Sequence, residues 1–232
     1  MTRSTKRVLV VDDESVTLED LCSVFIEHNH EVGGVFTFEV DQAGSTGEAV
    51  EKVRSRGEDA GYDVIVLDLR FTTEPSDRQG LHMAEALGVI RRLGHAIPIV
   101  IVFTGYGDLH TCVRAMRHGA WDFIEKFDQE SRSCYQLVVD SAVARLRGIQ
   151  QQERLRTAAL EWLPRNLAGL QEKFGGQIVA IWDAPPLKVI ASGKDAFDLE
   201  AALAPWRSRH PDWMYPFIIR IPENATSASL QG

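Results

Sequence analysis

Short apolar runs alternate with helix-like patterns along the first 150 residues. The apolar runs are rich in β-branched residues and too short for helices, so they predict strands at 6–11, 31–43, 62–68, 97–103 and 121–126. Between and after them, apolar residues three and four positions apart predict helices at 15–28, 46–56, 80–93, 107–119 and 131–147. Thr46 is the predicted N-cap of the second helix.

Five strands that alternate with five helices imply a parallel sheet with helices on both faces. Right-handed crossovers leave few topologies open, and the natural order for five such units is the doubly wound 2-1-3-4-5. In that arrangement a ligand binds in the crevice outside the carboxyl ends of the strands. We therefore expect an α/β domain over residues 5–147 with a site at that edge of its sheet.

The chain changes character after residue 147. Residues 148–175 predict a helical linker, in which Pro164 is expected to end or kink the helix. Residues 176–222 predict a small α+β module, built from a hairpin, a short helix that Pro205 should break or kink, and a third strand. Residues 223–232 predict a disordered tail, and the apolar stripe of the linker leaves both intramolecular packing and a homodimer open.

Charge separates the two parts of the chain. Residues 1–150 hold 24 acidic and 16 basic residues, whereas residues 151–232 hold nine of each. Neither part has the basic excess of a nucleic-acid-binding surface. No apolar stretch is long enough for a transmembrane helix, and the apolar run near the N-terminus is too short for a signal peptide. These features predict a cytoplasmic protein that binds neither nucleic acid nor membrane.

Polar side chains follow four of the predicted strands. Asp12 and Asp13 end the first strand, and Asp68 ends the third. Thr104 ends the fourth strand, and Lys126 ends the fifth. These four strands are neighbours in the order 2-1-3-4-5, so the five side chains are expected around one crevice.

This set of side chains predicts phosphoryl chemistry. Three nearby carboxylates repel one another, and a hard cation such as Mg²⁺ relieves that repulsion. With one Mg²⁺ and Lys126 the formal charges sum to zero, so the site could accept a phosphoryl group. Asp68 would attack phosphorus and form an aspartyl phosphate, with Thr104 donating to a phosphoryl oxygen. Each residue alone is more simply a turn former, a cap or a surface charge, but that explanation does not account for the joint pattern.

The stretches "VLVVDDES", "DVIVLDLR", "VIVFTGYGD" and "RAMRHGAWDFIEK" carry a family resemblance. Through them residues 5–147 resemble a response-regulator receiver domain of two-component phosphorelays. The resemblance implies a flavodoxin-like sheet and phosphoryl transfer to Asp68 from a histidine kinase or phosphotransfer protein. It also implies a switch that is phosphorylated itself and has no independent catalytic turnover.

The resemblance also assigns roles to single residues. It implies Mg²⁺ held by Asp13, Asp68 and the backbone carbonyl of Arg70, with Asp12 assisting through water. Thr104 and Phe123 would form a switch pair, in which the aromatic ring moves inward when the threonine engages phosphate.

The chain also departs from the family pattern. Phe127 stands where the family usually has proline, and the loop over residues 69–80 is longer than usual. Bulky Arg70 and Tyr106 beside the site are predicted to hinder attacking water and to lengthen the lifetime of the phosphoryl group.

The part after the receiver-like region predicts a protein-interaction output. It has no net charge, no basic recognition helix and no phosphate-loop spacing, which argues against DNA-binding and ATPase outputs. Through residues 162–203, which include the motif "SGKD", it bears a weak resemblance to a family of small uncharacterised α+β domains. That resemblance gives no activity, and the protein target is unknown. A rival is a magnesium-dependent phosphohydrolase with an aspartyl nucleophile, although such enzymes carry D-x-D on strand one and this chain has D-D-E.

Overall fold

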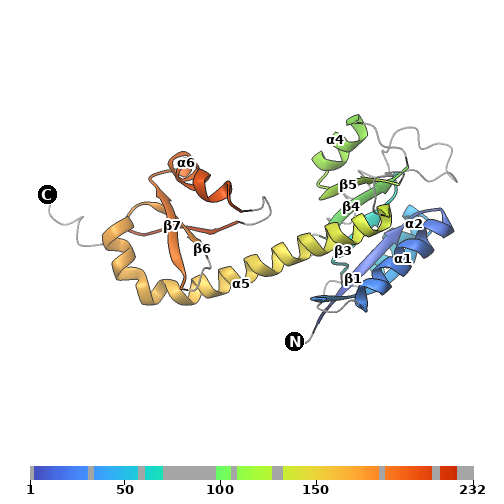
Figure 1. The fold of residues 1–232 in the computed structure, drawn as a ribbon, viewed down its shortest axis with the longest axis horizontal. Coiled ribbons are helices and arrows are strands. Elements are labelled where there is room, and N and C mark those ends of the chain that lie inside the picture. The colour runs from blue at the N-terminus through green and yellow to red at the C-terminus, as the bar shows by residue number, and fades with distance from the viewer. Residues whose placement is uncertain are drawn as a thin grey trace. The chain divides into compact units, whose positions relative to one another are not determined.

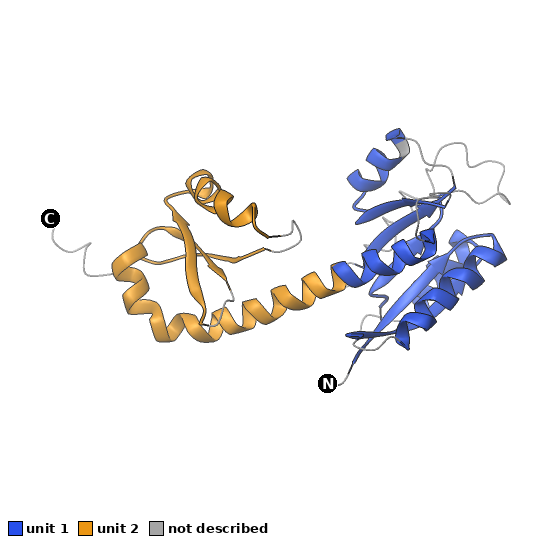
Figure 2. Cartoon of the chain, in the orientation of Figure 1, with its two compact units in different colours: residues 1–144 blue, residues 145–232 orange. Residues whose placement is uncertain are grey.

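The computed structural model describes residues 3–30, 34–56, 61–69, 98–105, 109–126, 133–182, 186–210 and 215–223. The chain divides into two compact units, residues 1–144 and residues 145–232 (Figure 2). Within the described ranges, no helix is both long enough and apolar enough to cross a membrane.

The first unit contains a five-stranded, all-parallel sheet with the order β2-β1-β3-β4-β5 (Figure 1). Its strands are β1 (Ser4–Val11), β2 (Phe36–Ala43), β3 (Val64–Leu67), β4 (Ile99–Thr104) and β5 (Asp122–Glu125). This confirms the predicted fold class and the predicted strand order. The second strand is shorter than the predicted 31–43, of which residues 31–33 lie outside the described part of the chain.

The apolar runs of the sheet are continuous because both of its faces are covered. All residues of β3 and β4 are buried, as is the carboxyl half of β1. In the described part of this unit the helices are α1 (Ser15–Asn29), α2 (Thr46–Ser55), α4 (Leu109–Arg117) and the start of α5 (Cys134–Phe174). One core cluster joins Ile65 and Val102 of the sheet to Ala49 of α2 and Ala115 of α4. The predicted helix at 80–93 lies outside the described residues.

The N-cap of α2 is Ser45, so the prediction of Thr46 was wrong by one residue. Ser45 has extended backbone angles, and its hydroxyl accepts a hydrogen bond from the Glu48 N–H at 3.2 Å. Glu48 in turn accepts from the Gly44 N–H at 2.9 Å. This arrangement resembles a capping box, except that the Glu48 side chain accepts from the residue before the N-cap and not from the N-cap itself.

The second unit contains a three-stranded antiparallel sheet with the order β7-β6-β8 (Figure 1). The strands are β6 (Ile178–Trp182), β7 (Lys188–Gly193) and β8 (Phe217–Arg220), and α6 (Ala196–Arg207) follows β7. One face of β6 packs Val179 and Ile181 in a cluster with Leu163 and Leu170 of α5. On the other face, Ala180 packs in a cluster with residues of α6.

Two prolines lie inside helices where the sequence predicts a break or a kink. Pro164 does not end α5, which continues to Phe174, but the helix bends in its C-terminal part (Figure 1). The second helix, α6, continues past Pro205 and ends two residues later, at Arg207. A proline inside a helix costs about 3 kcal/mol through a lost hydrogen bond and a steric clash. Leu163 and Leu170, which flank Pro164, are 8% and 6% exposed, and burying such leucines recovers about 2 kcal/mol each. Apart from Glu223, the predicted tail lies outside the described residues.

Candidate functional site at the carboxyl edge of the sheet

Backbone hydrogen bonds extend the sheet by one residue beyond several strand ends. The Asp12 N–H donates to the last residue of β2 at 3.0 Å, and the Asp68 N–H donates to Val11 of β1 at 2.9 Å. The Lys126 N–H donates to the carbonyl of Thr104 at 3.0 Å. These bonds fix the first residue after each strand at the same edge, so their side chains converge as the parallel topology requires.

The ammonium group of Lys126 joins the acids at this edge. Its Nζ lies 2.8 Å from Asp12 Oδ2 and 2.9 Å from Asp68 Oδ2. A third carboxylate, that of Glu14, lies 3.4 Å away through Oε2. The side chains of Lys126, Asp12 and Asp68 are 9%, 2% and 6% exposed, so this is a buried ion pair shared between two carboxylates.

Backbone donors hold the second oxygen of both buried carboxylates. Asp12 Oδ1 accepts from the Glu14 N–H at 2.9 Å, and Asp68 Oδ1 accepts from the Leu69 N–H at 2.5 Å. Each carboxylate therefore has one oxygen on the lysine and one on the backbone. This satisfies the polar groups that burial would otherwise leave costly.

Asp12, Asp13 and Asp68 form a cluster that fits a divalent cation. One carboxylate oxygen from each lies within 4.8 Å of those of the other two. Oxygen donors of this kind are the ligands that Mg²⁺ prefers. The sequence had predicted this trio from positions 12, 13 and 68, and the fold brings them together.

Burial and neighbouring charges shift the pKa values of Asp12 and Lys126. Burial raises the pKa of Asp12 to about 6, with a further contribution from the Asp68 charge, and the Lys126 and Glu14 hydrogen bonds oppose this only in part. Burial alone would lower the pKa of Lys126, but its hydrogen bonds to Asp12 and Asp68 outweigh that effect and raise it. Lys126 therefore carries a full charge at neutral pH.

Two further predicted residues lie on the strands beside the cluster. Thr104 is the last residue of β4 and is fully buried. Phe123 of β5 pairs in register with Val102 of β4 and is partly buried against the core. The described residues do not include Arg70, Tyr106 or Phe127, for which the sequence analysis predicts effects on the site.

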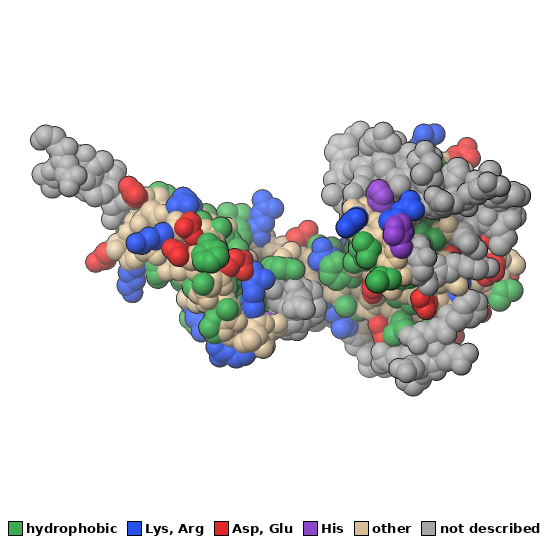
Figure 3. Space-filling view, turned by 90° about the horizontal axis from the view of Figure 1, so that it is seen from above, with side chains coloured by type: hydrophobic (Ala, Val, Ile, Leu, Met, Phe, Trp, Pro, Cys, Tyr) green, Lys and Arg blue, Asp and Glu red, His purple; other side chains and the backbone are tan. Residues whose placement is uncertain are grey.

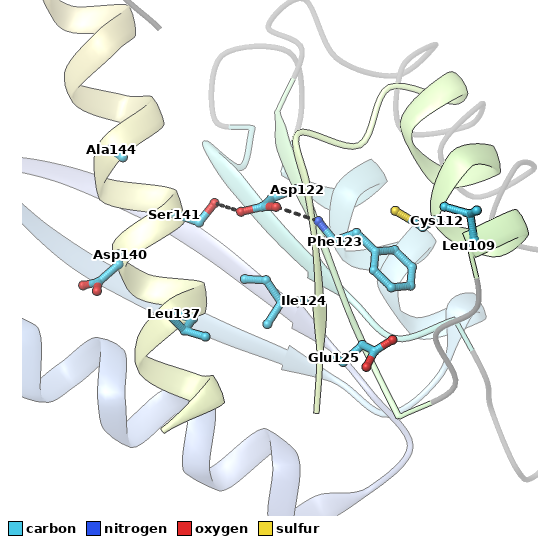
Figure 4. Close-up of a pocket in the computed structure, with 10 residues that line it drawn as sticks. All are labelled: Leu109, Cys112, Asp122, Phe123, Ile124, Glu125, Leu137, Asp140, Ser141 and Ala144. Carbon is cyan, nitrogen blue, oxygen red and sulfur yellow. Dashed lines mark hydrogen bonds between the residues drawn. The ribbon is translucent and has the colours of Figure 1, made fainter. Parts of the chain in front are cut away.

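Phe123 also lines a groove of about 740 Å³ formed by α4, β5 and α5. Figure 4 shows its ring beside Leu109 and Cys112, while Ser141 of α5 donates to Asp122 at 2.7 Å. Exposed hydrophobic side chains of α4 border this region, and Figure 3 shows hydrophobic side chains beside histidine and basic ones there. Sequence reasoning missed this groove because its lining comes from three elements that no local pattern links.

The contact between Glu14 and Lys126 was also missed by the sequence reasoning. The third acid of D-D-E is visible in the sequence, but its position beside a lysine 112 residues away is a property of the fold.

The first unit combines a doubly wound sheet with an acidic cluster, a threonine and a lysine at the carboxyl edge of that sheet. This is the combination that the sequence predicted for a receiver domain. A model of the response regulator receiver domain matches residues 8–135, which is more than half of the chain. The chain belongs to this family, whose receiver domains are phosphorylated switches of two-component signalling and interact with histidine kinases or phosphotransfer proteins.

Individual relatives show how far the similarity extends. The response regulator protein FleR of Pseudomonas aeruginosa is 26% identical over 230 residues, which cover 97% of this chain and 42% of FleR. The acid tolerance regulatory protein ActR of Rhizobium meliloti is 33% identical over 121 residues, 52% of each chain. The chain thus spans about half the length of the curated relatives it matches. A CheY-like receiver domain protein from Methanospirillum hungatei JF-1 is 20% identical, with a TM-score of 0.48, over 64% of this chain and 99% of that one.

Proposed function

We propose that this chain is a response regulator that is phosphorylated on Asp68. The observation that carries the proposal is the hydrogen-bonded contact of Asp68 with Lys126 inside a buried acidic cluster. The carboxylate oxygen of Asp68 forms a bond to phosphorus as the bond from phosphorus to the donor breaks. From phosphohistidine the leaving group is imidazole, which takes up a proton, and from acetyl phosphate it is acetate.

Asp12, Asp13 and Asp68 are the residues that would hold Mg²⁺, together with the predicted backbone carbonyl of Arg70. When bound, the ion supplies positive charge against the carboxylates and the incoming phosphoryl oxygens. The three carboxylate oxygens within 4.8 Å of one another support this assignment. In the finer prediction from the family, Asp12 acts through water.

Lys126 and Thr104 are the proposed partners of the phosphoryl group. The Lys126 ammonium, already beside Asp68 Oδ2, pairs with a phosphoryl oxygen, and the Thr104 hydroxyl donates to another. Phe123 is the proposed second half of the switch. Because its ring lines the groove between α4, β5 and α5, an inward rotation would alter the surface of that groove. The phosphorylation state would in this way reach a surface that a partner can contact.

Signalling is proposed to run from a histidine kinase or phosphotransfer protein to a protein target of the C-terminal module. The zero net charge of residues 151–232 supports a module that does not bind DNA. The burial of both faces of β6 under α5 and α6 supports a small folded unit rather than a flexible tail. The proposed boundaries remain 5–147 for the receiver domain, 148–175 for the linker and 176–222 for the module, and the proposed location is cytoplasmic.

Phosphorylation by a small donor tests the proposal. The protein is incubated with labelled acetyl phosphate and Mg²⁺, and the acyl phosphate is measured as label that hydroxylamine releases. We expect about one label per chain for the wild type and for Asp63→Asn, a control at the opposite end of β3. We expect none for Asp68→Asn or after chelation of the metal. Label that persists in Asp68→Asn would refute the assignment, and many turnovers on phosphomonoesters would favour the phosphohydrolase instead.

A further inference from the structure

Glu14 occupies a defined position at the mouth of the acidic site. It directly follows the acid pair and is the N-cap of α1, but its side chain makes no capping hydrogen bond. Its Oε2 instead accepts from Thr17 Oγ1 at 3.0 Å and lies 3.4 Å from Lys126 Nζ. The Glu14 side chain is 58% exposed and that of Lys126 only 9%, so Glu14 contacts the ammonium from its solvent side.

Thr17 fixes this contact. Thr17 is 4% exposed and stands on the first turn of α1, so its hydroxyl is a rigid donor. A free glutamate at the surface would spend little time on one ammonium because holding a long side chain costs entropy. The threonine hydrogen bond offsets part of that cost.

Glu14 also changes the charge balance at the site. The carboxylates of Asp12, Asp13 and Asp68, a divalent cation and the Lys126 ammonium sum to zero, and Glu14 makes the total one negative. The extra charge attracts a cation and repels a phosphoryl group. Glu14 also contacts Lys126, and the position of the Lys126 ammonium affects the binding of both the cation and the phosphoryl group.

We propose that Glu14 is a positioning residue that draws the Lys126 ammonium toward the mouth of the site, favouring the divalent cation and opposing the phosphoryl group. This inference rests on the proposed function. Lys126 competes with a cation for the oxygens of Asp12 and Asp68, and its contact with Glu14 weakens that competition. A phosphoryl group on Asp68 would pair with the same ammonium, so the Lys126 contact with Glu14 competes with phosphoryl binding.

The proposal predicts changes of opposite sign in one variant. In Glu14→Gln the affinity for Mg²⁺ alone falls and the affinity for beryllofluoride, a phosphoryl mimic, at saturating Mg²⁺ rises. Each change is expected to be about two- to fivefold, the range for a solvent-exposed ion pair. Simple damage to α1 or to the pocket would weaken both ligands together, so the pair of signs separates positioning from structure.

Isothermal titration calorimetry of the full chain with Mg²⁺, and then with beryllofluoride, provides both dissociation constants. Thr17→Val, which releases Glu14, is expected to shift both constants in the same directions by less. When Thr17→Val is combined with Glu14→Gln, it is expected to cause no further change in either dissociation constant, because the two residues act as one unit. Glu51→Gln, an exposed acid of α2, is the control for the same loss of charge elsewhere.

The outcomes distinguish this inference from the function on which it rests. Opposite shifts in Glu14→Gln that Glu51→Gln lacks support the proposal. Constants equal to those of Glu51→Gln, or a loss of affinity for both ligands, overturn it and leave the proposed function intact. A wild-type protein that binds Mg²⁺ but no beryllofluoride overturns the proposed function, and this inference with it.

Discussion

Replacement of Lys126 by methionine would test how the acidic cluster is held together. Methionine keeps much of the length and apolar volume of the lysine stem but has no ammonium. The carboxylates of Asp12 and Asp68 would then lose a partner that lies 2.8 and 2.9 Å away. In metal-free buffer we expect the free energy of unfolding to fall sharply.

The size of the loss follows from burial. Removing one member of a buried ion pair typically costs about 3 to 5 kcal/mol, because the other charge stays buried without compensation. Proton uptake limits that cost here, since the pKa of Asp12 is already raised to about 6 and rises further without the lysine. We therefore expect a loss of about 3 kcal/mol at neutral pH, near the lower end of the range.

The loss should depend on pH with a definite sign. The pKa of Asp12 is higher in the folded protein than the unfolded value near 4, so its contribution to stability is complete below about pH 4. That contribution is lost as the pH rises through the folded value, which is higher still in the variant. The difference between wild type and Lys126→Met is therefore largest at neutral pH and shrinks toward pH 4.

Urea denaturation followed by circular dichroism measures these differences. Lys6→Met is the matched control, because Lys6 Nζ also lies 2.9 Å from a carboxylate, that of Asp63, but the two side chains are 26% and 31% exposed. We expect this control to lose less than about 1 kcal/mol. Adding Mg²⁺ should restore much of the stability of Lys126→Met, because a ligand that binds only the folded state stabilises it. Equal losses in the two variants, or no response to Mg²⁺, would refute the reasoning.

Two further predictions concern groups away from the acidic cluster. Burial and a 2.7 Å hydrogen bond to Asp41 raise the pKa of Tyr62 to about 12. Between pH 10 and 12 the wild type should therefore lose about 2 kcal/mol of stability relative to Tyr62→Phe, as measured by urea denaturation. A difference in stability that stays constant over this pH range would contradict the prediction. Gly176 has φ of 79°, and a Cβ there would meet Glu223 at 3.0 Å, so Gly176→Ala should lower the unfolding free energy by about 1 to 2 kcal/mol. Gly169→Ala, inside α5 with open space around it, should instead raise the unfolding free energy by about 0.5 to 1 kcal/mol. Melting temperatures that shift in the same direction in the two variants would contradict both predictions.

Much of the receiver fold could be predicted from local pattern. Runs such as residues 64–67 are apolar at every position because a parallel strand is covered on both faces, and this pattern is visible without coordinates. The cluster at the carboxyl edge was predictable for a related reason. In a parallel sheet every strand ends at the same edge, so polar residues that follow strands meet there whatever their distance in sequence.

Local pattern did not decide the outcome where several interactions compete. Ser45 and Thr46 are both good N-caps, and only the backbone angles and the Glu48 hydrogen bonds select the serine. Pro164 left both an end and a kink of the helix open. The helix α5 continues past Pro164 because Leu163 and Leu170, on either side of it, pack in the core of the second unit. In both cases the deciding interaction involves residues that a local rule does not weigh.

The sequence by itself determined which chemical groups this protein has and at which edge of the sheet they gather. Only the tertiary structure decided how they share their partners. Lys126 divides its hydrogen bonds among Asp12, Asp68 and Glu14. The physical reason is that sequence pattern encodes which face or end of an element a residue occupies, whereas hydrogen-bond partners depend on distances of a few tenths of an ångström between distant segments. Those distances are set by the packing of the whole domain.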